Sequence, residues 1–359
     1  MSAAEFFAAL PIPIVQAPMV GASGLEMALA VSGAGGLGSL AAGALSPDAI
    51  EAQGAKLRKA GAPFAINLFV NRPARPSGEV VASAIQRLAP WYAELGLPPP
   101  DAPNDFAPDF DAQFAALIRA RPPAASFVFD QLTPAEMAAL RESGILVIGT
   151  ATTVAEARVW AELGADAIAA QGAEAGGHRG HFLAGVDSSL VGTMALVPAI
   201  IAATGLPTLA AGGIMDGRGV AAALALGAAA AQMGTAFLLA DEATISPPWR
   251  GALEKASDDP TRLTRALTGR HARGIETRFM REMRSVENEV PAYPVQNRLT
   301  QPLRAAAAAA GDADLLSLWA GQGVTLAGPG RAADLVAGWW DEAKATAQAL
   351  GASTAARRG

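Results

Sequence analysis

The segment whose residue types most suggest chemistry is a glycine-rich run of ten residues that contains a histidine. It reads Gln-Gly-Ala-Glu-Ala-Gly-Gly-His-Arg-Gly over positions 171–180, and four of its residues are glycines. Glycine allows backbone amides to approach a ligand closely. A histidine with an ordinary pKa of ~6.5 can take or give a proton near neutral pH. We therefore interpret His178 as a candidate general base, with a solvated loop histidine as the alternative.

Two short glycine-containing segments further along the chain suggest a phosphate site. They are Ala-Ala-Gly-Gly-Ile at 210–214 and Gln-Met-Gly-Thr at 232–235. Barrels of eight parallel strands commonly bind phosphate between the loops after strands seven and eight, through backbone amides and a helix N-terminus. Asp216 is placed to cap the helix that follows the first segment. Together the segments favour a phosphate-bearing cofactor, and glycines that only form tight turns are the alternative.

Two side-chain amides lie within or at the end of apolar runs. Asn67 interrupts the run Phe-Ala-Ile-Asn-Leu-Phe-Val at 64–70, and Gln171 ends the run that precedes the glycine-rich segment. A buried amide must find hydrogen-bond partners, and the edge of a planar heteroaromatic ring offers both donors and acceptors. Each amide is therefore a candidate cofactor ligand, although an amide bonded to the backbone fits the pattern equally well.

The elements that must position these residues are short apolar runs, which alternate with alanine-rich segments. The alanine-rich segments begin with residues typical of helix N-termini, such as Ser46 before a proline and Thr133 with Glu136 three residues later. Eight such units predict a closed (β/α)8 TIM barrel rather than an open doubly wound sheet, because the polar and glycine-rich clusters then share the rim at the carboxyl ends of the strands. The predicted strands are 14–19, 36–40, 64–70, 125–129, 145–150, 167–171, 208–212 and 230–237.

The chain is expected to divide into two regions. Residues 1–245 are predicted to form the cofactor-binding barrel, interrupted by an insertion at about 72–111 that contains three consecutive prolines. The strand pattern stops at about 246, so residues 246–359 are expected to form a small C-terminal lobe of helices and loops over the barrel mouth. Two uncharged stretches, 188–215 and 219–240, are long enough to span a bilayer, but prolines or glycines divide each into a helix and a short strand.

The composition excludes several classes of protein. Lys and Arg total 27 against 33 Asp and Glu, a net charge of -6 that gives no basic surface for nucleic acid. The chain has no cysteine, which excludes disulfides, thiolate metal ligands and cysteine nucleophiles. The first ten residues lack the basic and apolar pattern of a secretion signal, so a cytoplasmic location is expected.

These motifs together resemble those of the FMN-dependent nitronate monooxygenases, formerly called 2-nitropropane dioxygenases. The resemblance covers most of the chain and includes Gln-Ala-Pro-Met at 16–19, Glu-Ala-Gly-Gly-His at 174–178 and the two glycine-containing segments. Leu-Trp-Ala-Gly-Gln-Gly at 318–323 is similar to the class I branch. The resemblance implies a flavoprotein oxidoreductase that uses O2 to oxidise alkyl nitronates, such as propionate 3-nitronate, to a carbonyl compound and nitrite, and that thereby detoxifies these anions.

The resemblance also implies roles for individual residues. His178 would remove the α-proton of a neutral nitroalkane, whereas a nitronate arrives already deprotonated. Tyr293, one of only two tyrosines, is expected to line the substrate pocket, although a packed loop aromatic fits equally well. No metal is expected. The residues implied to hold FMN are Pro18, Met19, Asn67, Gln171, Gly176, Gly213, Gln232, Met233, Gly234 and Thr235.

Other functions stay open from the sequence. A flavin-dependent enoyl reductase or an NADH:quinone reductase of the same superfamily would share the barrel and the Gly-Gly-His loop. A metal-dependent hydrolase would need Glu174, His178 and His181 as ligands, all on one flexible loop, and a non-catalytic flavin-binding module would need His178 to be dispensable. The expected partners are a nitronate or nitroalkane and O2, without nucleic acid or membrane, and a homodimer is compatible with the sequence.

Overall fold

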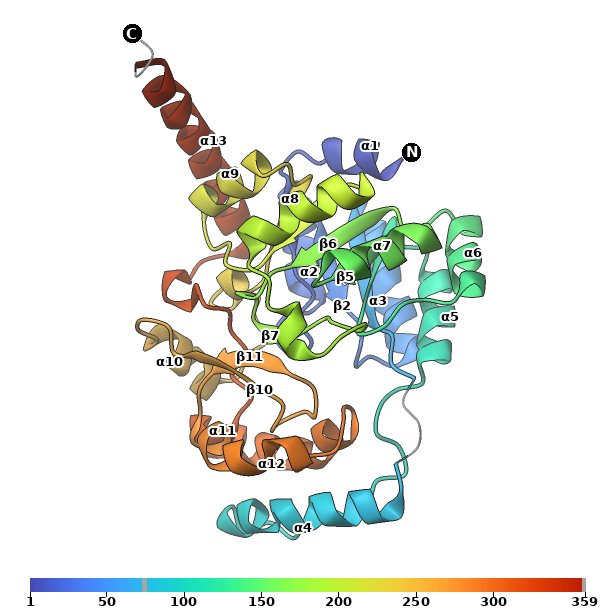
Figure 1. Cartoon of the computed structure of the whole chain (residues 1–359), viewed down its shortest axis with the longest axis vertical. Helices are drawn as coiled ribbons and strands as arrows, with labels where there is room; N and C mark the ends of the chain where they lie inside the picture. The colour runs from blue at the N-terminus through green and yellow to red at the C-terminus, as the bar shows by residue number, and fades with distance from the viewer. Residues whose placement is uncertain (73–75, 357–359) are drawn as a thin grey trace.

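The structure is a computed structural model that describes residues 1–72 and 76–356. Its centre is a sheet of eight parallel strands in the order β1-β9-β8-β6-β5-β4-β3-β2 (Figure 1). A bridge between Val15 and Leu37 joins the two ends of this order, so the predicted (β/α)8 barrel is confirmed and the open sheet is excluded. Each predicted run overlaps one strand. The strands are β1 (Ile14–Gln16), β2 (Gly38–Ala41), β3 (Phe64–Phe69), β4 (Ala124–Val128), β5 (Leu146–Ala151), β6 (Ala167–Gln171), β8 (Thr208–Ala211) and β9 (Ala230–Met233).

Helices cover the outside of the barrel, and their first residues carry the expected caps. The Ser46 hydroxyl accepts a hydrogen bond from the Ala49 N–H at 3.2 Å. Thr133 and Glu136 form a reciprocal capping box. Such caps satisfy N–H groups that the first turn leaves free. The helices of the barrel are α2 (Leu25–Gly33), α3 (Pro47–Ala60), α5 (Phe110–Ala120), α6 (Pro134–Glu142), α7 (Val154–Leu163), α8 (Thr193–Thr204) and α9 (Gly217–Ala225).

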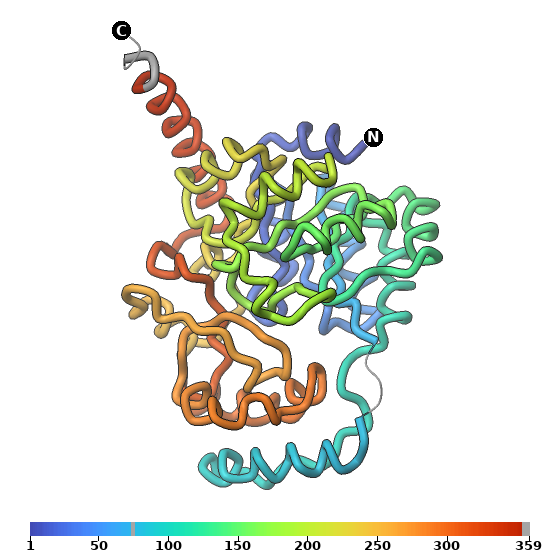
Figure 2. The backbone as a smooth tube through the Cα atoms, viewed as in Figure 1, coloured from blue at the N-terminus to red at the C-terminus, as the bar shows by residue number. Residues whose placement is uncertain are grey.

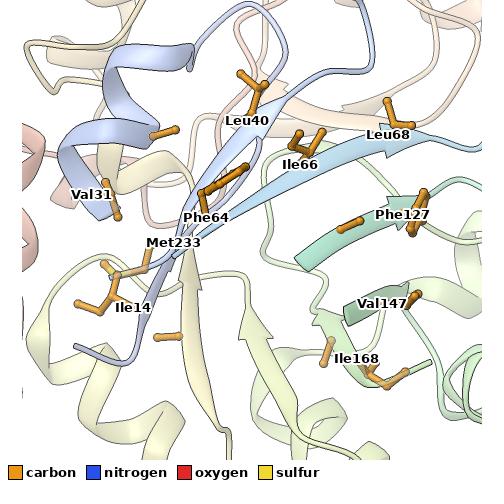
Figure 3. Close-up of a cluster of buried hydrophobic side chains, with 14 of the residues drawn as sticks. Ile14, Val31, Leu40, Phe64, Ile66, Leu68, Phe127, Val147, Ile168 and Met233 are labelled. Atoms are coloured by element: carbon orange, nitrogen blue, oxygen red, sulfur yellow. The ribbon is translucent and has the colours of Figure 1, made fainter. Parts of the chain in front are cut away.

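The side chains of the barrel strands divide into an outward set, which packs against the helices, and an inward set, which fills the barrel. Outward residues such as Ile66 and Phe127 lie under the helices and are fully buried (Figure 3). Each such side chain stabilises the fold by ~1.5–3 kcal/mol relative to exposure. The inward set includes Ala65 and Ala167, and Phe7 of α1 (Ala3–Ala8) packs with this set. Because side chains alternate along a strand, the inward set continues toward the carboxyl ends of the strands, where the candidate site residues lie.

The insertion packs against the C-terminal region. Its helix α4 (Gly78–Glu94) lies beside α12 (Val295–Ala310), as Figures 1 and 2 show. Trp91 and Tyr92 of α4 belong to a second apolar core with Phe279 and Leu299. The Tyr92 hydroxyl donates a hydrogen bond to the Leu299 carbonyl at 2.6 Å. The other helices of this region are α10 (Pro247–Glu254), α11 (Arg278–Met283) and α13 (Ala332–Ala356), with short 3-10 turns at η3 (Arg284–Glu289), η4 (Ala313–Leu315) and η5 (Val324–Leu326).

One expectation for the C-terminal region is wrong, because this region contains strands as well as helices and loops. Strands β10 (Thr261–Thr264) and β11 (Ala272–Ile275) are antiparallel, and β11 also pairs with the two-residue strand β7 (Gly177–His178). These strands are short, carry arginines and lack an alternation of apolar and polar residues, so they have no period-two signal. Their pairing joins the C-terminal region to the glycine-rich loop.

The two uncharged stretches form helices and strands of the barrel, as predicted. The first contains α8 and β8, and the second contains α9, β9 and the 3-10 turn η2 (Thr235–Phe237), while η1 (Val186–Ser189) precedes them. Among the helices that the structure describes, none is long and apolar enough to cross a membrane. Helix α13 packs against α9 and α2, with the Trp339 ring 5.0 Å from that of Phe237, and its far end projects from the body (Figure 1).

Candidate active site

A cavity of about 440 Å³ lies at the carboxyl ends of the barrel strands, a volume typical of small-molecule sites. The strand ends and glycine-rich loop form part of its wall, and residues 249–323 of the C-terminal region form another part. The Met233 side chain instead lies in the barrel core with 1% exposure, because it alternates with Gln232 along β9. The other predicted site residues all line the cavity: Pro18, Met19, Asn67, Gln171, Gly176, His178, Gly213, Gln232, Gly234, Thr235 and Tyr293.

His178 is held in the cavity wall by backbone pairing and by aromatic rings. Its residue pairs with Ala272 across the β7–β11 ladder, and its carbonyl accepts a hydrogen bond from Gln171 Nε2 at 2.9 Å. The imidazole centroid lies 5.5 Å from that of Phe129, 5.6 Å from that of Tyr293 and 5.6 Å from that of Trp319. These contacts restrict the ring to one orientation.

The environment of His178 favours the neutral imidazole. Burial, together with the positive charges of Arg270 and Arg304, lowers the pKa of His178 to about 3. At neutral pH the ring is therefore uncharged, which is the form that a general base needs. The same burial raises the pKa of the neighbouring Tyr293 to about 12, so this phenol stays protonated.

The glycine-rich loop has a fixed shape. The buried Arg179 donates hydrogen bonds to the carbonyls of Gly172 at 2.6 Å and Ser189 at 2.6 Å. A Cβ on Gly176 would lie 2.5 Å from the carbonyl carbon of Ala320, so only glycine fits where residues 320–321 pass the loop. A rigid loop of this kind keeps the base in place without help from a ligand.

Asn67 and Gln171 use their amides differently. Gln171 donates to the His178 carbonyl and accepts from the Gly180 N–H at 2.8 Å, so it organises the glycine-rich loop from inside the cavity wall. Asn67 Nδ2 donates to the Ser126 carbonyl at 3.1 Å and hydroxyl at 3.0 Å. No residue in the described part of the chain donates to Asn67 Oδ1, which therefore faces the cavity as a free acceptor.

The two glycine-containing segments follow the neighbouring strands β8 and β9, and both line the cavity. Gly213 has a φ of 73°, a conformation that L side chains rarely adopt. Asp216 caps α9, as predicted, by accepting a hydrogen bond from the Gly219 N–H at 3.0 Å. Within the described ranges, the N–H groups of Gly213 and Gly234 donate to no protein acceptor. Free N–H groups beside a helix N-terminus suit an anionic group such as a phosphate.

Arg304, Thr268 and Trp319 line the cavity but were not site candidates in the sequence analysis. Arg304 donates to Asn297 Oδ1 at 2.8 Å, and none of the described carboxylates pairs with it. Burial lowers its pKa to about 10, so it stays cationic at neutral pH. Thr268 and Trp319 also line the cavity beside His178. The only local signal was that Asn297, Thr300 and Arg304 lie at positions i, i+3 and i+7, which places polar side chains on one face of a helix.

The geometry does not support a metal site in this loop. Glu174 receives hydrogen bonds from the Thr193 N–H at 3.0 Å and hydroxyl at 2.8 Å. The His181 ring lies 6.5 Å from that of His271. Across residues 1–72 and 76–356, no group of three or more acidic, histidine or cysteine side chains could hold a metal ion.

The comparisons with known proteins agree with one another. The sequence profile of the nitronate monooxygenase family matches residues 4–340. A probable nitronate monooxygenase of Staphylococcus saprophyticus is 40% identical over 313 residues, which cover 86% of this chain and 88% of the relative. A probable nitronate monooxygenase of Staphylococcus aureus is 38% identical over 317 residues, which cover 88% of this chain and 89% of the relative.

Two solved structures are similar to this chain. One is a nitroalkane oxidase from Streptomyces ansochromogenes, with a TM-score of 0.89 and 41% identity over 96% of this chain and 99% of that structure. The other is FabK from Thermotoga maritima, with a TM-score of 0.76 and 29% identity over 98% of this chain and 99% of that structure.

Proposed function

The chain belongs to the nitronate monooxygenase family, and on that premise we propose that it uses FMN and O2 to oxidise alkyl nitronates to a carbonyl compound and nitrite. Membership of this family makes it a flavin-dependent oxidoreductase. The observation that carries the proposal is a neutral, half-buried imidazole, His178, in the wall of a cavity that also presents free backbone N–H groups.

The residues at the phosphate end of the cavity fit FMN. The N–H groups of Gly213 and Gly234 would receive the phosphate, with Gln232 and Thr235 in the same wall. The backbone of Pro18 and Met19 would lie along the ring system. FMN, when bound, supplies the electron acceptor for the nitronate.

The free acceptor Asn67 Oδ1 would bond a ring N–H of FMN. Gln171 and Gly176 would support the ring through the shape of the glycine-rich loop, since Gln171 is bonded to that loop.

His178 would serve as the base for neutral nitroalkanes. The C–H bond α to the nitro group breaks, the proton passes to the imidazole, and the electron pair stays on the substrate as the nitronate. Phe129, Tyr293 and Trp319 surround the imidazole and exclude water from this step.

Purification followed by rapid mixing tests this function. The protein should be yellow and release FMN on acid treatment, and anaerobic ethylnitronate should bleach the flavin band within one turnover. NADH alone should leave the band unchanged. Bleaching by NADH without reaction with the nitronate would favour a reductase of the same superfamily, and a folded, colourless protein that takes up no FMN would refute the proposal.

Arg304 supports an anionic substrate such as propionate 3-nitronate, and hence a role in detoxification. The Arg304 guanidinium lines the cavity. Within the described part of the chain, its hydrogen-bond acceptors are Asn297 and Ser317, and both are neutral. A cation without a carboxylate partner is stabilised when an anion binds beside it. The carboxylate of propionate 3-nitronate would supply that charge.

Replacing Arg304 by glutamine should raise the KM for propionate 3-nitronate by ~10-fold or more, since a hydrogen bond to a charged group contributes ~1.5–3 kcal/mol. The KM for ethylnitronate, which has no carboxylate, should change by less than ~3-fold. The matched control is Arg298→Gln on the same helix, whose exposed side chain bonds Gln301. Equal changes for both substrates in Arg304→Gln, or no change for either, would contradict an anion-binding role.

A further inference from the structure

The hydroxyl of Thr268 is shared between His178 and the backbone of Arg270. His178 Nε2 lies 2.9 Å from Thr268 Oγ1, and that hydroxyl in turn donates to the Arg270 carbonyl at 3.0 Å. The Arg270 N–H approaches the same oxygen at 3.4 Å. Thr268 is 1% exposed, so water does not compete for these bonds.

The proton count at Thr268 fixes the direction of its bond to the imidazole. A threonine hydroxyl has one proton to donate and two lone pairs to accept with. No other donor in the described part of the chain reaches the Arg270 carbonyl oxygen, so we assign the hydroxyl proton to that acceptor. The two lone pairs then receive the Arg270 N–H and the imidazole Nε2, which must therefore carry a hydrogen.

The other ring nitrogen of His178, Nδ1, is then unprotonated and can accept a proton from a substrate. Among the described residues, none forms a hydrogen bond with His178 Nδ1, and this atom, unlike His181 Nδ1, is not sealed from accessible space. Because His178 lines the cavity, Nδ1 reaches the space where a substrate binds. With Nε2 protonated, Nδ1 has a lone pair; with the opposite tautomer it would be a hydrogen-bond donor and could not act as a base.

We propose that Thr268 is a positioning residue that holds His178 in the Nε2–H tautomer, so that Nδ1 is the atom that takes the α-proton of a neutral nitroalkane. This inference rests on the proposed function. In the step, the substrate C–H bond breaks, an Nδ1–H bond forms, and the electron pair remains on the substrate as the nitronate. The resulting imidazolium keeps its Nε2–H bond to Thr268.

Helix α12 holds the backbone of the Thr268 loop. Gln296 Nε2 donates to the Ala266 carbonyl at 2.7 Å, and the Thr300 hydroxyl donates to the Leu267 carbonyl at 2.6 Å. The Gly269 N–H closes the loop by donating to the Arg265 carbonyl at 2.7 Å. Removal of the Thr268 hydroxyl removes its bonds to the imidazole and to the Arg270 backbone, while the three bonds above still hold the rest of the loop.

The kinetic test compares Thr268→Val with Thr268→Ser in the FMN-loaded enzyme. Valine matches threonine in shape but cannot accept the Nε2–H, so kcat/KM for nitroethane should fall by ~10-fold or more while that for ethylnitronate changes by less than ~2-fold. Serine should restore nitroethane oxidation to within ~3-fold of the parent. Thr300→Val removes one support of the same loop but keeps the Thr268 hydroxyl, so it should slow nitroethane oxidation by less than Thr268→Val does.

The tautomer itself can be observed by NMR of the enzyme labelled with ¹⁵N-histidine, with the His178 signals assigned from their absence in His178→Asn. The parent should show a protonated Nε2 and an unprotonated Nδ1, and Thr268→Val should show a mixture. A protonated Nδ1 in the parent, or parental nitroethane oxidation by Thr268→Val, would overturn the role of Thr268. The base function of His178 would survive either result, because it is tested separately by the ratio of nitroethane to ethylnitronate oxidation in His178→Asn.

Discussion

Replacing His178 by asparagine is expected to slow the oxidation of neutral nitroethane by ~10²-fold or more, and to slow the oxidation of preformed ethylnitronate much less. Asparagine keeps a polar side chain of similar reach but has no basic nitrogen. Nitroethane must lose its α-proton before it can be oxidised, whereas the nitronate has already lost it. The ratio of the two losses in kcat/KM therefore measures the contribution of the base.

The matched control for this variant is His271→Asn. His271 is a half-buried histidine that does not line the cavity, so both substrates should react within ~3-fold of the parent rate. Flavin content must equal that of the parent in both variants. Parental oxidation of nitroethane by His178→Asn, or an equal loss with both substrates while flavin stays bound, would remove His178 from the role of base.

The same assignment makes a prediction about pH. Because burial and two nearby arginines lower the pKa of His178 to about 3, the imidazole stays neutral down to mildly acidic solution. The kcat/KM for nitroethane should therefore change by less than ~2-fold between pH 7 and pH 5.5. A base with an ordinary pKa of ~6.5 would be ~90% protonated at pH 5.5, and a ~10-fold loss over this range would show that the imidazole titrates normally.

The barrel was predictable from sequence because the patterns that mark its strands and helices each lie within a few consecutive residues. Each strand is a short apolar run, and caps such as Ser46 and Thr133 mark where helices begin. The closed barrel then places residues that follow different strands, such as Asn67 and Gly213, around one cavity. Sequence position relative to a strand was therefore enough to bring most of the candidate site together.

The C-terminal half of the site was not predictable in the same way. Thr268 lies in a loop between two short strands, and it meets His178 because the second of them, β11, pairs with β7, a two-residue strand far away in sequence. Arg304 lies on a helix, and no local rule states which helix face meets the barrel mouth. Tyr293 was predicted only from the resemblance, although the structure places it 5.6 Å from the imidazole.

The position of helix α4 was also not predictable, because it depends on contacts with residues far away in sequence. Its buried residues Leu88 and Trp91 follow a helical spacing that the sequence displays, but their partners Phe279 and Leu303 lie about two hundred residues later. Periodicity predicts that a face is buried without predicting what covers it. The insertion was therefore recognised as an interruption of the barrel, and its place against the C-terminal region came only from the structure.

The second large effect is expected for Gly213→Val, which should weaken FMN binding by ~10²-fold or more. Gly213 has a φ of 73°, so a β-branched residue there will rotate the peptide and turn its N–H away from the cavity. Its side chain would also grow toward Glu174, whose Cβ lies 3.4 Å from the position of an added Cβ. Titration of the flavin-free protein with FMN, followed by fluorescence quenching, measures the loss.

Backbone strain alone would also lower stability, so the prediction depends on a control with the same strain away from the cavity. Gly61 has a φ of 77°, caps the end of α3, and has no atom within 4 Å of an added Cβ. Gly61→Val should therefore lose a similar free energy of unfolding in urea but bind FMN like the parent. Gly213→Ala provides the same comparison, against Gly61→Ala, if the valine variant does not fold. If the folded Gly213 variants bound FMN as tightly as the Gly61 variants, the glycines at 212–213 would only form a turn, and the phosphate site would have to lie elsewhere in the cavity.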